Sequence, residues 1–391
     1  MINAGIYLDH NATTPLRPEA AAAMTAAMAI AGNGSSVHRH GRLARRLIED
    51  AREQVALLVG AEPAEVVFTS GGTEANALAL LGCGRRRRLV SDVEHASVLQ
   101  NAPGAERLPV DGEGVVRIDA LDRLLAASSE PAVVSVMLAN NETGVIQPLA
   151  EIARIARRHG ALVHSDGAQA AGRIEVDVRR LGIDLLSLSA HKLGGPAGVG
   201  ALVTGPDVPL TALLAGGGQE RGRRAGSENR IGIAGFGAAA DVAARREGMQ
   251  RLAALRDTLE QRLCRVAPTA RIPGAGAPRL PNTSCIVMPG VPGETQVIAF
   301  DLAGVSISAG AACSSGKVTG SHVLAAMGVG EEIANCSIRV SLGWTTTDAD
   351  VERIFEVWTS VYARLCGSGE GSGGLAVASS VHWNPVGKVT E

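Results

Sequence analysis

The feature that most constrains this chain is the pairing of short apolar runs with polar ends. The pattern is clearest between residues 161 and 200, where the apolar runs 161–164 and 184–189 have the length of buried parallel strands. The first run leads into the segment SDGAQ, which contains Asp166, and the second leads into AHK, which ends at Lys192. Ligands of open α/β sheets sit outside the carboxyl ends of the strands, so both polar segments are predicted to face one site.

Apolar runs and periodic segments alternate through most of the preceding chain as well. Helices are expected at 19–30, 42–59 and 75–81, and a strand at 66–69. Strands and helices then alternate through 88–91, 96–101, 121–127, 133–138 and 149–159. This alternation predicts an α/β fold with a mostly parallel sheet and helices on both faces.

The chain of 391 residues is too long for one ordinary core, so two domains are expected. The pattern changes beyond residue 238, where one long amphipathic helix over about 238–266 is followed by Pro- and Gly-rich turns and short strands such as 284–288. We expect a large domain at 15–250 and a small α+β domain formed by 1–14 and 251–366. The Gly- and Ser-rich residues 367–391 are predicted to be a disordered tail.

Composition excludes several classes of function. A net charge of −2 and a pI near 6.5 provide no electrostatic footprint for nucleic acid or an anionic membrane. No apolar segment is long enough to span a bilayer, and no signal peptide is recognised before the first strand. The six cysteines are scattered without a C-x-x-C pair, which favours a reduced, cytoplasmic compartment.

Asp166 and Lys192 at neighbouring strand ends are the pair that pyridoxal phosphate (PLP) requires. The lysine forms a Schiff base with the cofactor, and the carboxylate keeps the pyridine nitrogen protonated. The alternative for each residue alone is a surface lysine and a helix-capping aspartate. Aromatic residues make up only 2% of the chain, so His95 in the segment EHAS is a candidate for stacking on the ring and for moving protons.

The segment SGGTE, which contains Gly72 and Thr73, lies between a predicted strand and a predicted helix. Backbone N–H groups at such a helix start bind anions, and Ser189 and His191 could add donors to a phosphate site. The alternative is an ordinary helix cap.

Two further residues stand out near the end of the predicted small domain. Cys313 lies among Gly and Ser residues in an aperiodic segment, which favours a nucleophile on a mobile arm over a buried structural thiol. Arg339 lies in the predicted strand 337–343, where its guanidinium either clamps a substrate carboxylate or forms a structural ion pair.

These residues fall within motifs that resemble those of the cysteine desulfurases, which are class V aminotransferase-like PLP enzymes of fold type I. The matching segments are YLDHNATTP, SSVHRHGR, FTSGGTEAN, EHASV, NNETGVIQP, HSDGAQAAG, SLSAHKLGGPAGVGAL, GGGQERGRRAGSEN, RLPNTS, SAGAACSSGKVTGSHVLAAMG and SIRVSLGWTTTDAD. They occur in order over about residues 6–360. The resemblance implies a mostly parallel seven-stranded type of sheet in the large domain and a smaller α+β domain.

The resemblance also implies roles for the cofactor residues. Lys192 would bind PLP covalently and act as the base at the substrate α-carbon, Asp166 would pair with the ring nitrogen, and His95 would stack on the ring. Five more residues would bind the cofactor: Gln169 would contact the ring hydroxyl, and Gly72, Thr73, Ser189 and His191 would bind the phosphate. Ser227, where the family usually has threonine, would reach the phosphate from the partner subunit of a homodimer.

For the substrate, the resemblance implies L-cysteine, held at its carboxylate by Asn141 and Arg339, with Asn141 also contacting the cofactor. Cys313 would take the sulfur as a persulfide, release alanine, and pass the sulfur to an acceptor protein such as an iron–sulfur scaffold. Cys313 is also the candidate for a transient iron–sulfur ligand. The long cysteine loop resembles the subgroup that serves iron–sulfur cluster assembly.

Two alternatives remain open from the sequence. A selenocysteine lyase or an aminotransferase on the same fold would keep Lys192 and Asp166 without needing the thiol of Cys313. A non-catalytic scaffold that binds anions through its Gly-rich loops would take up no PLP.

Overall fold

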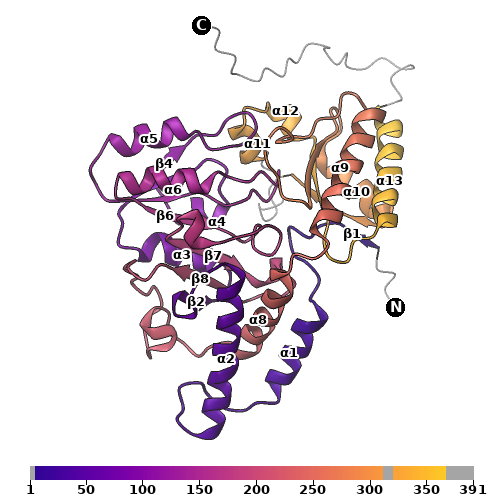
Figure 1. Cartoon of the computed structure of the whole chain (residues 1–391). Coiled ribbons are helices and arrows are strands. Elements are labelled where there is room, and N and C mark those ends of the chain that lie inside the picture. Colours follow the sequence, from indigo (N-terminus) through magenta and orange to yellow (C-terminus); the bar gives the residue numbers. More distant parts are fainter. Residues whose placement is uncertain (1–4, 311–319, 367–391) are drawn as a thin grey trace.

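The computed structural model describes residues 5–310 and 320–366, and its largest sheet has seven strands in the order β2-β8-β7-β6-β5-β3-β4 (Figure 1). These strands are β2 (Val66–Thr69), β3 (Arg87–Ser91), β4 (Glu106–Leu108), β5 (Ala132–Ser135), β6 (Leu162–Asp166), β7 (Leu185–Ser189) and β8 (Gly200–Thr204). The strands from β7 to β4 are parallel, whereas β8 is antiparallel to both of its neighbours. The predicted mostly parallel α/β sheet is confirmed.

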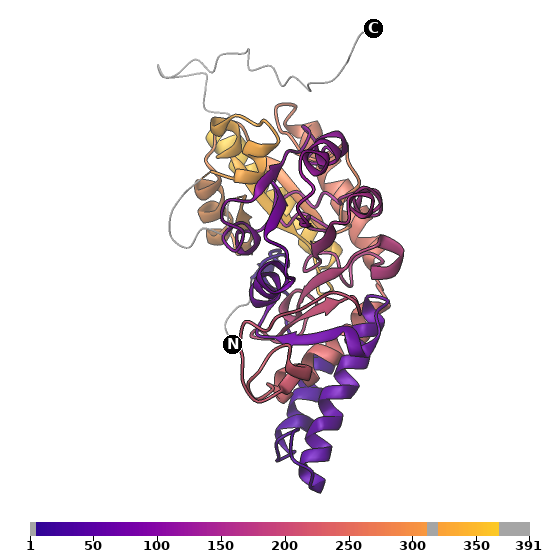
Figure 2. The same ribbon diagram turned by 90° about the vertical axis from the view of Figure 1, so that its left-hand side faces the viewer.

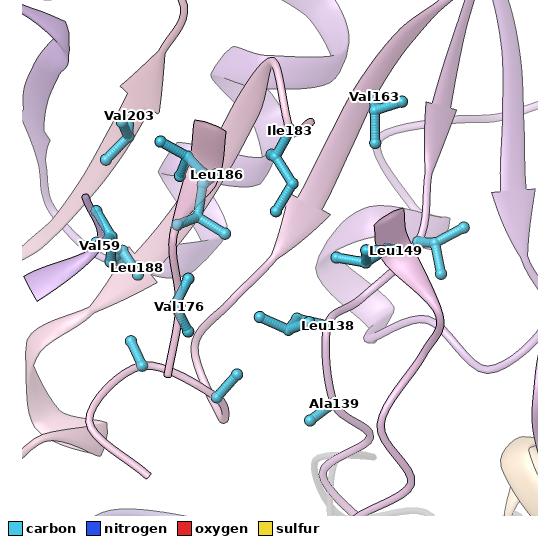
Figure 3. Packing of buried hydrophobic residues seen from close by; sticks show 14 of the residues in the cluster. Val59, Leu138, Ala139, Leu149, Val163, Val176, Ile183, Leu186, Leu188 and Val203 are labelled. Atoms are coloured by element: carbon cyan, nitrogen blue, oxygen red, sulfur yellow. The ribbon is translucent and has the colours of Figure 1, made fainter. Parts of the chain in front are cut away.

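The strands at the centre of this sheet are buried on both faces. Figure 3 shows the packing around Leu186 and Leu188 of β7, which lie in one cluster with Val163 of β6, Val203 of β8 and Leu149. All five residues of β7 and the last four of β6 are buried, so both strands are covered on both of their faces. Burying each Val or Leu side chain contributes about 1.5–3 kcal/mol.

Helices cover this sheet and extend beyond one end of it. They are α1 (Pro18–Met28), α2 (Arg39–Leu58), α3 (Gly72–Gly82), α4 (Ala96–Leu99), α5 (Ile118–Ala126), α6 (Leu149–Arg158), α7 (Val178–Leu181) and α8 (Arg230–Ala244), with the 3-10 turns η1 (Pro63–Glu65), η2 (Ala190–Lys192) and η3 (Gln219–Gly222). Helices α1 and α2 both pack against α8 and form the elongated lower part of the molecule (Figures 1 and 2).

The expectation of one long helix over 238–266 is wrong. Helix α8 ends at Ala244, and a separate helix, α9 (Met249–Val266), follows it. The backbone between them has φ of 51° at Arg246 and 81° at Gly248, which no right-handed helix accommodates. The amphipathic pattern continues on both sides of the break, so periodicity alone did not reveal it. Gly248 was the available signal for a helix end.

The remaining elements form two small sheets and their covering helices. The strands are β1 (Ile6–Tyr7), β9 (Thr283–Val287), β10 (Val305–Ser306), β11 (Ser308–Ala309) and β12 (Ser337–Ser341), and the helices are α10 (Gly293–Leu302), α11 (His322–Ala326), α12 (Glu331–Ala334) and α13 (Asp348–Cys366). Strands β11, β12 and β9 form an antiparallel sheet, and β1 pairs parallel with β10.

A separate hydrophobic cluster lies between the antiparallel sheet and α9, α10 and α13. Leu8, Phe300 and Trp358 are at its centre. Leu8 brings the N-terminal segment into this cluster, although the large sheet follows directly in sequence. On this ground we propose the division into a large domain at 15–250 and a small domain at 1–14 and 251–366. The predicted tail at 367–391 lies outside the described residues.

Across residues 5–310 and 320–366, no helix has both the length and the apolar character needed to cross a membrane.

Candidate active site

Asp166 and Lys192 lie at the same edge of the large sheet, as the sequence predicted. Asp166 is the last residue of β6, and β7 leads directly into η2, which ends at Lys192. The two strands are parallel neighbours, and their register places Asp166 beside Ser187. Both side chains therefore belong to the carboxyl edge, where ligands of such sheets bind.

The carboxylate of Asp166 is buried and oriented by two donors. Asn76 on α3 donates from Nδ2 to Oδ2 at 2.8 Å, and the backbone N–H of Ala168 donates to Oδ1 at 3.0 Å. Each carboxylate oxygen keeps a lone pair free. The carboxylate can therefore accept a further proton-bearing nitrogen.

His95 caps α4 and is linked to Asp166 through two other side chains. Its Nδ1 accepts from the backbone N–H of Ser97 at 3.1 Å and lies 2.7 Å from the Ser97 hydroxyl. That hydroxyl in turn accepts from Asn76 Nδ2 at 2.9 Å. Burial lowers the pKa of His95, an effect that the negative charge of Asp166 opposes. The imidazole is therefore neutral near pH 7.

The amine of Lys192 lies against the N-terminal segment of the chain. Its Nζ donates to the carbonyl oxygen of Asn11 and, at 2.9 Å, to that of Ala12. The side chain of Asn11 is buried and donates to the Asn141 carbonyl at 3.1 Å and to the Thr283 hydroxyl at 2.9 Å. Asn11 thereby connects the lysine to both parts of the molecule.

Gln169, predicted to contact the cofactor ring, is also held by this segment. Its Nε2 donates to the Asn11 carbonyl at 2.9 Å, and its Oε1 accepts from Arg173. Arg173 is buried and forms no ion pair with any described residue. Burial, reinforced by the charge of Arg339, lowers the pKa of Arg173 to about 9. It remains charged at neutral pH, so the site carries a positive charge that no side chain around it balances.

The predicted phosphate cradle comes together at the start of α3. The helix begins at Gly72, and the preceding Gly71 provides no side-chain cap for its first N–H groups. A Cβ on Gly72 would lie 3.5 Å from the Cβ of Ser189, so the glycine leaves space between the helix start and the strand end. Thr73, the next residue, is exposed. This open, uncapped helix start suits an anion such as the phosphate of PLP.

His191 closes the other side of the cradle. Its Nδ1 lies 2.9 Å from the hydroxyl of Ser189. Burial, with the nearby charge of Lys192, lowers the pKa of His191 to about 4. The imidazole is neutral at physiological pH and acts there as a hydrogen-bonding group.

Arg339 lies on β12 with its side chain almost completely buried, only 2% exposed. Its Nη1 donates to the Asn141 carbonyl at 3.2 Å, and its Nη2 donates to the carboxylate of Asp9 at 2.7 Å. Nε is buried without a partner. The side chain of Asn141 makes no hydrogen bond within the described part of the chain. Arg339, the predicted ligand of the substrate carboxylate, therefore keeps N–H groups without a partner, while its Nη2 is bonded to Asp9.

Two predicted residues are not brought into this cluster. Ser227 is exposed in the segment between η3 and α8, and its side chain forms no hydrogen bond among the described residues. Cys313 lies outside the described residues, so its predicted roles as nucleophile and as metal ligand stay predictions. Within 5–310 and 320–366 there is no group of three or more His, Cys, Asp or Glu side chains that could hold a metal ion.

The sequence reasoning missed several polar residues of the site. Asn11 and Asp9 lie in YLDHNATTP, and Asn76 lies in FTSGGTEAN; both segments were recognised as motifs without a role for these side chains. The available signal was an Asn four positions after Gly72 in a helix whose other side chains are mostly apolar. Nothing in the sequence indicated that Ser97 would join Asn76 to His95.

Comparisons with known proteins agree with this arrangement. The model of the Aminotransferase class-V family matches residues 6–354. A cysteine desulfurase of Cereibacter sphaeroides is 45% identical over 376 residues, which cover 92% of this chain and 96% of the relative. An IscS-like cysteine desulfurase of Mycobacterium tuberculosis is 40% identical over 378 residues, with 92% and 96% covered.

Solved structures show the same likeness. A NifS-like protein from Rickettsia africae superimposes with a TM-score of 0.85 at 37% identity, covering 92% of this chain and 99% of that chain. A second NifS-like protein has a TM-score of 0.84 at 33% identity, covering 92% and 100%.

The fold and the paired lysine and aspartate therefore define a PLP-dependent enzyme of fold type I, and the chain belongs to the class V aminotransferase family. Within that family it is a member of the cysteine desulfurases.

Proposed function

We propose that this chain removes the sulfur atom from L-cysteine and that Cys313 receives it. The observation that carries the proposal is the placement of Asp166 and Lys192 at one sheet edge, beside an uncapped helix start and a buried arginine. In the overall step, the C–S bond of cysteine breaks and an S–S bond forms at Cys313. L-Cysteine and the Cys313 thiol thus give L-alanine and a Cys313 persulfide.

The cofactor residues are arranged for PLP, which when bound withdraws electrons from the substrate and so labilises bonds at its α and β carbons. Lys192 would attach the cofactor and move the proton at the α-carbon. Asp166 would hold the ring nitrogen protonated through its free lone pairs. His95, neutral and half-buried beside these groups, would stack on the ring and donate from Nε2.

The remaining polar groups suit an anionic substrate and an anionic cofactor. Arg339 keeps free N–H groups for a carboxylate, and the side chain of Asn141 adds an unengaged amide. The uncompensated charge of Arg173 raises the local positive potential further. Gly72, Thr73, Ser189 and His191 would hold the phosphate, while Gln169 would contact the ring hydroxyl with its second amide hydrogen.

Partners belong to the proposal as well. Ser227 is exposed and unengaged, as expected of a residue that would reach the phosphate site of a second copy in a homodimer. The acceptor of the sulfur would be a protein such as an iron–sulfur scaffold, with Cys313 as a transient cluster ligand. The cytoplasm is the compartment we propose for this chemistry.

The test uses two variants of the purified full chain. The wild-type protein should be yellow, and borohydride should fix the chromophore to it; Lys192→Ala should lose this covalent attachment. Cys313→Ala should bind PLP normally but lose sulfide release from cysteine, whereas the exposed Cys264→Ala should retain it. Mass spectrometry of the wild type after incubation with cysteine should show one added sulfur atom on Cys313.

Other outcomes point to the alternatives. Full sulfide release by Cys313→Ala would contradict its role as acceptor and favour an aminotransferase or a selenocysteine lyase. A colourless protein that takes up no PLP would favour an anion-binding scaffold.

A further inference from the structure

We propose that Asn76 and Ser97 are positioning residues that couple Asp166 to His95, so that the acid facing the cofactor nitrogen fixes the tautomer of the histidine. The inference rests on the proposed function, since it assigns His95 and Asp166 to one cofactor. It adds two residues that contact neither cofactor nor substrate and act through others.

The coupling is a continuous chain of three hydrogen bonds. Asn76 Nδ2 lies 2.8 Å from Asp166 Oδ2 and 2.9 Å from Ser97 Oγ, and Ser97 Oγ lies 2.7 Å from His95 Nδ1. Asn76, Ser97 and Asp166 are 1%, 8% and 7% exposed. Water cannot easily replace these bonds, so the orientation of each group depends on the next.

The chemistry of the groups determines the direction of each bond. An ionised carboxylate only accepts, so Asn76 must turn its NH₂ toward Asp166; the opposite amide orientation would set two acceptors against each other. The second hydrogen of the same nitrogen then points to Ser97 Oγ. With its oxygen accepting, Ser97 has its own O–H available to donate to His95 Nδ1.

His95 is thereby held in one tautomer. Its Nδ1 already accepts from the backbone N–H of Ser97, and it also receives the Ser97 hydroxyl hydrogen. Two donors aimed at one nitrogen exclude a proton on Nδ1, so the neutral ring carries its proton on Nε2. That nitrogen is the one left to face the cofactor and the reacting atoms.

Other charges also act on His95. Asp166 on β6 favours the imidazolium, whereas Lys192 at the end of η2 and His322 on α11 disfavour it. Glu94, the preceding residue, is fully buried, and burial raises the pKa of its carboxyl well above the usual range. Its Oε1 atom accepts from the backbone N–H of Met137, so this oxygen is engaged elsewhere and does not compensate the loss of a hydrogen bond at Nδ1.

The alternative is that Asn76 and Ser97 only fill space beneath the site. One detail favours coupling: the Asn76 Oδ1 atom is buried without a partner while its Nδ2 serves two acceptors. A side chain selected only for packing gains nothing from a buried, unsatisfied oxygen, which carries a free-energy cost.

The experiment measures the His95 ring directly, by NMR of ¹⁵N-histidine-labelled full-length protein with and without PLP. Its signal is assigned from the spectrum of His95→Gln. The wild type should show the Nε2–H tautomer. Ser97→Ala should raise the pKa of His95 by about 0.5–1 unit, because the neutral form loses one hydrogen bond. Ser97→Thr, which keeps the hydroxyl, should restore the wild-type value.

The chain offers a matched control. Ser135 Oγ is a buried hydroxyl bonded to a different histidine, His164, whose Nδ1 lies 2.8 Å away. Ser135→Ala should change the signals of His164 and leave the pKa of His95 unchanged.

Coupling through to Asp166 is tested with Asn76. Asn76→Ala should raise the pKa of His95, and Asn76→Ala/Ser97→Ala should shift it no further than Ser97→Ala alone, since both act through one chain. An unchanged tautomer and pKa in Ser97→Ala, or fully additive shifts in the double variant, would overturn the proposal. The NMR readouts do not require turnover. Sulfide release by Cys313→Ala would therefore contradict the proposed function without affecting the test of the coupling between Asp166 and His95.

Discussion

The buried carboxyl of Glu142 makes the stability of this enzyme depend on pH. Glu142 follows Asn141 directly and is only 4% exposed. Its Oε2 accepts from the hydroxyl of Ser321 at 2.5 Å, and Ser321 caps α11 by accepting from the backbone N–H of Leu324. Burial raises the pKa of Glu142 from its ordinary value of 4.5 to about 7.

The sign and size of the effect follow from proton linkage. Because the folded state holds this proton more tightly than the unfolded state, the contribution of Glu142 to stability is fully present below pH 4.5 and is lost as pH rises through about 7. A shift of one pKa unit corresponds to about 1.4 kcal/mol of folding free energy. The shift of the Glu142 pKa from 4.5 to about 7 therefore corresponds to a stability contribution of about 3 kcal/mol.

Glu142→Gln should remove this dependence. Glutamine stays neutral at every pH and can still accept from Ser321 through its carbonyl oxygen. The urea midpoints of the wild type and the variant are to be compared at about pH 5 and about pH 8. From about pH 5 to about pH 8, the free energy of unfolding of the variant should rise relative to that of the wild type by up to about 3 kcal/mol.

The exposed Glu331→Gln is the control for the loss of one carboxyl group. Between the two pH values, the free energy of unfolding of this control should change by about as much as that of the wild type. A Glu142→Gln variant whose stability relative to the wild type is the same at both pH values would refute the argument, because the buried carboxyl would then already be ionised at low pH.

Two ion pairs lead to further predictions. Glu220→Gln should lower the free energy of unfolding by about 3–5 kcal/mol in urea, because Arg52, bonded to both Glu220 oxygens at 2.7 and 2.8 Å, would lose its buried counter-ion. Asp9→Asn should lower the KM for L-cysteine in steady-state assays while leaving kcat unchanged, because Arg339 would no longer share its charge with an internal carboxylate. A higher KM would instead show that Asp9 serves to orient Arg339.

The placement of Asp166 and Lys192 was predictable because it depends on local pattern. β6 and β7 are short and buried, and Asp166 and Lys192 lie at or just beyond the carboxyl end of each strand. In a parallel sheet these ends meet at one edge, so the pair could be brought together without knowledge of the other contacts.

The partners of these residues were not predictable from local pattern. Lys192 bonds to carbonyls 180 residues away, and Asn76 reaches Asp166 across 90 residues. Such contacts depend on how whole elements pack, and an amide or a serine has the same local signature in a site as on a surface. The break between α8 and α9 was missed for the opposite reason, since the periodic pattern continues across it.

The N-terminal segment imposes an order on the biogenesis of the site. Ser341 donates its backbone N–H to Leu8, and its hydroxyl accepts from the backbone N–H of Asn11, 330 residues earlier. Until β12 has been synthesised, the segment lacks its bonds to Ser341, although earlier residues such as Gln169 and His191 can already hold it. Its full set of hydrogen bonds therefore forms late in translation. The site around Lys192 should therefore reach its fully bonded arrangement only after nearly the whole protein has been translated.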